Sequence, residues 1–140
     1  MYQRQTRAFL NEPHGETHIH WQGDILIVKA VGPFNIEGIE ASLLTLKETI
    51  ASSNKSTWYR LDYADDNTFG DLEVIKGIGK SFFWSFENGC QSIASVTSNS
   101  LQRTLFESFL ARHDLNLHPF DYEEDALNWL KTQQIQKTHS

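Results

Sequence analysis

The chain has little cysteine and no long apolar run. Cys90 is the one cysteine among 140 residues, which excludes an internal disulfide framework and is typical of a reducing compartment. No stretch is long and apolar enough to span a membrane, and residues 1–10 lack the apolar segment of a signal peptide. We therefore expect a cytoplasmic protein without a membrane span.

Basic residues are also scarce. Lys and Arg number 12 against 18 Asp and Glu, so the formal net charge is −6. The phosphate backbone of a nucleic acid would be repelled on average, and no basic stripe with interleaved aromatic residues reverses this effect. We therefore expect no nucleic acid among the partners.

Strand and helix patterns alternate along the chain. Five segments have the apolar and aromatic character of strands, namely residues 17–21, 25–31, 57–63, 92–97 and 115–120. Amphipathic segments begin near Ile36, Asp71, Leu101 and Tyr122. This order, ββαβαβαβα, predicts the α/β class, with a mixed, mostly parallel sheet of about five strands and four helices.

The chain length suits one domain. A chain of 140 residues should bury roughly two-thirds of its unfolded surface, which is enough for a core without metal or disulfide. Residues 17–132 form the predicted domain, preceded by an arm at 1–16. The polar residues 133–140 form a C-terminal tail that we expect to fray.

Local signals predict how several elements begin and pair. The short connection 22–24 contains Gly23 and favours an antiparallel hairpin between the first two strands. Residues 25–28 are apolar on both faces, which predicts a central strand covered on two sides. Asn35 is the predicted N-cap of the first helix. Gly77 and Gly79 each lower helix propensity by roughly 1 kcal/mol, so the bounds of the helix near Asp71 stay open.

The motifs in this order resemble a known family. They are residues 23–28 with 32–35, residues 61–63, and residues 120–121 with 126–130. From residue 15 to 131 the chain resembles the STAS domain, the fold of anti-sigma-factor antagonists, and in particular its SpoIIAA-like branch of small bacterial proteins. The resemblance implies a non-catalytic regulatory module that binds protein partners. Some members are named together with lipid-transfer domains, which implies an alternative function as carrier of a small apolar, lipid-like ligand.

The resemblance also indicates a switch loop. In regulatory members, an Asp-Ser-Ser-Gly or Asp-Ser-Thr-Gly turn follows the third strand, and a partner kinase phosphorylates its second hydroxyl. The nearest match is residues 66–70, which puts Thr68 at the hydroxyl position, with Asp62, Asp66 and Gly70 as further loop residues. Phe69 replaces the family's glycine, and the carboxylates of the loop disfavour a phosphate. We therefore expect Thr68 not to be a phosphorylation switch; its hydroxyl or a nearby carboxylate would cap the next helix.

Residues with metal-binding or nucleophilic chemistry lack suitable partners. His18 and His20 point to one face of a strand with His14 nearby, but no carboxylate or cysteine stands at a matching spacing. The acidic loop after the third strand lacks the calcium-loop spacing. No base for Cys90 is evident in the sequence. We therefore expect no metal, no cofactor and no catalytic residue.

The segment 71–88 is the predicted working surface. One helical stripe faces the sheet, formed by Leu72, Ile75, Ile78, Phe82 and Phe86. Val74, Phe83 and Trp84 lie off this stripe, and we expect them to bind a protein partner or a second copy of the chain; the alternative is a second buried face. A carrier would instead have its pocket beneath this helix, lined by Phe82 and Phe86.

Overall fold

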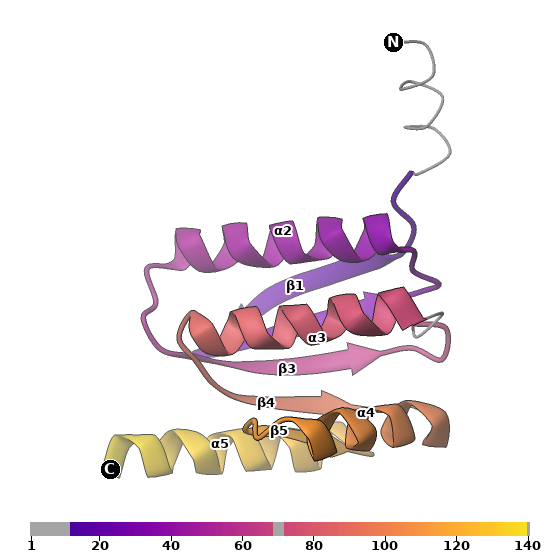
Figure 1. Ribbon diagram of the computed structural model, residues 1–140. Coiled ribbons are helices and arrows are strands. Elements are labelled where there is room, and N and C mark those ends of the chain that lie inside the picture. Colours follow the sequence, from indigo (N-terminus) through magenta and orange to yellow (C-terminus); the bar gives the residue numbers. More distant parts are fainter. Residues whose placement is uncertain (1–11, 69–71, 140) are drawn as a thin grey trace.

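The computed structural model describes residues 12–68 and 72–139, and side chains as far as residue 136 (Figure 1). The elements are β1 (Glu16–Gln22), β2 (Ile25–Val31), α2 (Ile36–Ser53), β3 (Trp58–Ala64), α3 (Leu72–Glu87), β4 (Cys90–Val96), α4 (Ser100–Arg112), β5 (Leu117–Phe120) and α5 (Glu123–His139). This order and the α/β class match the prediction from the sequence.

The five strands form one sheet in the order β1-β2-β3-β4-β5. The first pair is antiparallel, and Gln22 lies opposite Ile25, so the hairpin turn consists of Gly23 and Asp24. Gly23 has a φ of 60°, a backbone conformation that glycine adopts without steric cost. The other strand pairs are parallel, as expected when a helix connects each strand to the next.

Helices cover both faces of the sheet. On one face, Leu26 and Val28 of β2 share a cluster with Phe82 of α3 and Phe106 of α4. On the other face, Ile25 and Ile27 pack with Ala126 and Leu130 of α5. Side chains at 25–28 are at most 6% exposed, which confirms the predicted central strand. Figure 1 shows α2 and α3 side by side, and the two helices are in contact.

Side-chain caps position the ends of two helices. Asn35 Oδ1 accepts a hydrogen bond of 2.8 Å from the backbone N–H of Gly38, which confirms the predicted N-cap of α2. Asn99 caps α4 in the same way, through the N–H of Gln102 at 2.9 Å. These bonds satisfy amides that the first helical turn leaves without a partner.

The last helix is longer than the sequence predicted. We expected fraying from Gln133, but α5 continues to His139. Gln133 Oε1 accepts hydrogen bonds from Asn116 Nδ2 at 3.0 Å and from Ser92 Oγ at 3.3 Å. A polar side chain here ties the helix to the sheet, so polarity alone was a poor guide to where the helix ends.

The two glycines of α3 are explained by helix packing. A Cβ at Gly77 would collide with Ile39 Cγ2 of α2, and a Cβ at Gly79 would lie 2.9 Å from Phe109 Cε2 of α4. Glycine costs helix propensity at both positions. In exchange, the side chains of Ile39 from α2 and Phe109 from α4 approach the backbone of α3 closely.

Candidate functional site

A cavity of about 70 Å³, partly open to solvent, lies between the sheet, α2 and α3. Its wall is mostly apolar and includes Ile19, Val28, Leu46, Ile78, Phe82 and Phe106. Of the described residues that line it, only Arg60 and Asp62 carry charge. The site therefore combines an apolar space with one ion pair.

Arg60 and Asp62 face the same side of β3 because side chains alternate along a strand. Arg60 Nε donates to Asp62 Oδ1 at 2.6 Å, and Nη2 donates to Asp62 Oδ2 at 2.8 Å. The Arg60 residue is 4% exposed. Such a bidentate contact is the strongest geometry available to an arginine and a carboxylate.

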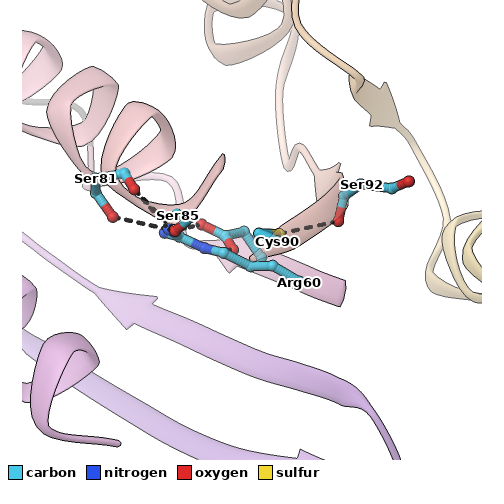
Figure 2. Close-up of polar contacts among 6 residues, drawn as sticks. Arg60, Ser81, Ser85, Cys90 and Ser92 are labelled. Atoms are coloured by element: carbon cyan, nitrogen blue, oxygen red, sulfur yellow. Dashed lines mark hydrogen bonds and ion pairs between the residues drawn. The ribbon is translucent and has the colours of Figure 1, made fainter. Parts of the chain in front are cut away.

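Helix α3 supplies the remaining acceptors of the guanidinium. Arg60 Nη1 donates to Ser81 Oγ at 2.8 Å and to Ser85 Oγ at 2.9 Å. The Ser85 hydroxyl donates in turn to the Ser81 carbonyl oxygen at 2.9 Å. Figure 2 shows both serines turned toward Arg60 from the helix. These bonds join β3 to α3 and leave every nitrogen of the guanidinium with a protein acceptor.

Burial controls protonation around this pair. Burial raises the pKa of Asp62; the charge and the hydrogen bonds of Arg60 oppose this shift, and the net direction is upward. Burial also raises the pKa of the Cys90 thiol to about 12, although the Arg60 charge opposes it. Cys90 Sγ donates to the Ser92 carbonyl oxygen at 3.4 Å (Figure 2). A thiol with this pKa is not a nucleophile at neutral pH.

The Asp62 side chain keeps part of its surface accessible. Its side chain is 15% exposed, against 5% for Arg60, and it lines the cavity. Ser95 of β4 lies opposite Asp62 in the strand register and lines the same cavity. None of the described side-chain hydrogen bonds uses the Ser95 hydroxyl. By contrast, the Thr17 and Ser42 hydroxyls at the cavity are hydrogen-bonded to each other.

The predicted switch loop is held by Asp65. Thr68 is 2% exposed, and its hydroxyl donates to Asp65 Oδ1 at 2.7 Å. The same oxygen accepts the backbone N–H of Gly32 at 3.1 Å and of Asn67 at 3.2 Å. Burial alone would raise the pKa of Asp65, but the hydrogen bonds from Thr68, Gly32 and Asn67 hold it below its ordinary value.

The structure thus gives Thr68 a different role from the predicted helix cap. Its hydroxyl fastens the loop to Asp65 instead. Of the other loop residues, Asp66 accepts a hydrogen bond from Asn99 at 3.2 Å. Gly70 lies outside the described residues, as do Phe69 and Asp71. That Thr68 is not phosphorylated stays a prediction.

The predicted partner surface on α3 is divided. Val74 is 0% exposed and packs with Phe34 and Ile39, so placing it on the surface was wrong: α3 has a second buried side against α2 and the loop before it. Trp84 is half-buried, with Lys47 Nζ 5.9 Å from its ring centroid. Phe83 is 37% exposed. A role of these residues in partner binding stays a prediction.

The two aromatic residues predicted to line a pocket behave differently. Phe82 is 3% exposed and lines the cavity. Phe86 is half-buried, packs against the core cluster, and is not part of the cavity wall. Sequence reasoning missed Arg60 and Ser95. A charged residue within an aromatic strand, two positions before Asp62, was the available signal for Arg60.

In the described part of the chain, no group of three or more His, Cys, Asp or Glu could hold a metal ion. His18 is exposed, and its Nε2 lies 3.3 Å from Glu16 Oε2. The described helices also include none that is long and apolar enough to cross a membrane.

No protein-family model and no curated protein matches this chain. Among solved structures, it is similar to an uncharacterized protein of the DUF3478 family with a SpoIIAA-like fold, from Shewanella loihica PV-4. The two are 19% identical, with a TM-score of 0.59, and the match covers 86% of this chain and 96% of the other. The chain therefore has a SpoIIAA-like fold, as the sequence resemblance implied.

Proposed function

We propose that the protein is a non-catalytic binding module of STAS type, acting in the cytoplasm, that holds a small and mostly apolar ligand. The observation that carries this proposal is the cavity of about 70 Å³ between the sheet, α2 and α3. An apolar cavity of about 150 Å³ is enough for benzene. In proportion to its volume, this cavity would take about three heavy atoms, and the rest of a longer ligand would extend through the open side.

The chemistry around the cavity supports binding rather than catalysis. Arg60 and Asp62 are already paired with each other, so neither is positioned as a free acid or base. The Cys90 thiol has a pKa of about 12, and its burial withholds it from a ligand. A catalytic site would need a titratable group matched to the working pH.

A protein partner remains the second candidate function, and Phe83 supports it. This side chain is 37% exposed, and its ring contacts Phe109 and His113 edge-on, at centroid distances of 5.8 and 4.9 Å. An aromatic residue held by its neighbours is a typical interface anchor. If a second copy binds there, sedimentation will show a concentration-dependent dimer that Phe83→Ala abolishes; an unchanged monomer at all concentrations would exclude that form of partner.

The ligand function is tested with xenon, an apolar probe without a head group. We expect saturable amide shifts on dissolving xenon, confined in the NMR spectrum to residues at the cavity such as Val28 and Phe82. Ala30→Leu should abolish them, because the larger side chain fills the cavity that Ala30 lines. Ala51→Leu is the matched control on the exposed side of α2. Shifts that are absent in the wild type, or that persist in Ala30→Leu, would contradict the proposal.

A further inference from the structure

Among the described residues that line the cavity, the polar groups include free acceptors, and the one cation, Arg60, is paired with Asp62. Each nitrogen of the Arg60 guanidinium donates to Asp62 or to a serine of α3. Asp62 accepts one hydrogen bond at each oxygen, whereas a carboxylate offers about four lone-pair sites. Its accessible surface and the Ser95 hydroxyl both line the cavity.

The free acceptors and the paired cation at the cavity favour some polar head groups of a ligand over others. A carboxylate would meet the negative charge of Asp62, and the Arg60 charge that could offset this repulsion is already paired with Asp62. An ammonium group would lie close to the Arg60 charge, and like charges repel strongly where water is excluded. A neutral donor such as a hydroxyl adds no charge and can donate to the unused lone pairs of Asp62.

We propose that Asp62 and Ser95 bind the hydroxyl group of a neutral aliphatic alcohol whose carbon chain lies against Phe82 and Ile78. The hydroxyl donates to Asp62 and accepts from Ser95. The cavity of about 70 Å³ receives this group with its first carbons, and the chain continues toward the open side. This assignment rests on the proposed function, since it needs the cavity to be a ligand site.

The test compares three probes with the same six-carbon chain: 1-hexanol, hexanoate and hexylammonium. Each is titrated into the protein at neutral pH and followed by amide shifts in the NMR spectrum. We expect 1-hexanol to bind about tenfold more tightly than either ion, or better. Ser95→Ala should weaken 1-hexanol by about three- to tenfold, the range for one hydrogen bond.

Ser92→Ala is the matched control on the same strand. Ser92 hydrogen-bonds with Asn116 and Gln133 beside α5 and does not line the cavity. Its removal should leave the affinity for 1-hexanol unchanged. An equal loss of affinity in both serine variants would overturn the role of Ser95.

Asp62→Asn supplies a second, independent measurement. Without the carboxylate, the Arg60 charge loses its counterion, so the preference should invert and hexanoate should bind about tenfold more tightly than 1-hexanol. An unchanged preference in a folded Asp62→Asn variant would overturn the role of Asp62. If this variant does not fold, the three probes and the Ser95 variant still decide the proposal.

The outcomes separate this inference from the proposed function. Equal affinities for all three probes, removed together by Ala30→Leu, would overturn the head-group assignment and keep the ligand function. Xenon binding without 1-hexanol binding would also overturn the head-group assignment and keep the ligand function. If neither xenon nor any of the six-carbon probes binds, both proposals are wrong.

Discussion

Ile39 of α2 lies directly against Gly77 of α3, at a point where a Cβ on the glycine would collide with the isoleucine side chain. Both residues are buried. Val74, one turn earlier on α3, packs in one cluster with the same isoleucine and Phe34. The close approach of the two helices thus depends on one residue having no side chain, and it forms part of the frame around the cavity.

Gly77→Ala should destabilise the protein. Alanine would improve helix propensity by roughly 1 kcal/mol, but inserting a methyl group into a packed interface costs about 1 to 3 kcal/mol. We expect a net loss of about 1 kcal/mol in the free energy of unfolding, measured by urea denaturation. Lys80→Ala, at an exposed position in the middle of α3, controls for changes in helix propensity. A Gly77→Ala variant more stable than the wild type would show that the helices separate without cost.

Replacing Arg60 alone should be far more costly than replacing both members of the ion pair. Arg60→Met leaves Asp62 without its counterion, and breaking a buried pair in this way typically costs about 3 to 5 kcal/mol. The double variant Arg60→Met/Asp62→Leu should recover most of that loss, because apolar replacements of a buried pair are often neutral. Urea denaturation of the three proteins measures both values. Equal losses in the single and double variants would mean that the charges do not depend on each other.

Stability should fall in acid through Asp65. Because its folded-state pKa lies below the unfolded value of about 3.9, its hydrogen bonds stabilise the fold above that pH. That contribution is lost as the pH falls through the folded-state pKa. Thr68→Val should lower the free energy of unfolding by roughly 2 kcal/mol at pH 7, which lies in the range for a hydrogen bond to a charged group. The difference in free energy of unfolding between this variant and the wild type should narrow toward pH 3.

Thr68→Ser is the control for this experiment, since it keeps the hydroxyl that donates to Asp65. It should retain the pH dependence of the wild type, whatever its stability at neutral pH. If the difference in free energy of unfolding between Thr68→Val and the wild type stays constant from pH 7 to pH 3, the assignment to Asp65 is wrong.

Cys90 should resist thiol reagents while the protein is folded. The residue is 3% exposed, and burial raises its pKa to about 12, so both access and thiolate are lacking at pH 8. We expect labelling by iodoacetamide to be slow in buffer and complete in guanidinium chloride, as measured by mass spectrometry. Rapid stoichiometric labelling of the native protein would mean that β4 opens readily.

The elements that the sequence predicted correctly depend on neighbours along the chain. The bounds of β2 follow from a run of apolar residues, and the start of α2 follows from a side chain that bonds to an amide three residues later. Periodicity and capping are local, so they can be read without knowledge of the fold. The resemblance to SpoIIAA-like proteins was carried by short motifs and by the order of the elements, and the similarity to a solved structure confirms that fold.

The residues that sequence reasoning misplaced depend on distant neighbours. Val74 is buried because α2 and the loop before it cover a second side of α3. The helical period left a partner surface and a second buried face open as alternatives, and only the packing of α2 decides between them for Val74. Gln133 extends α5 because Ser92 and Asn116 approach it from β4 and the loop before β5. Such contacts form only once segments far apart in the chain have packed.

The sequence by itself therefore determined the strands, the helices, their order and the class of the fold, because periodicity, caps and turns act over a few residues. Only the tertiary structure decided the candidate site. Arg60 and Asp62 lie on one strand, but the serines that complete the guanidinium come from α3, and Ser95 comes from β4. The cavity is the space left among side chains of all these elements, and its shape is set by how they pack together.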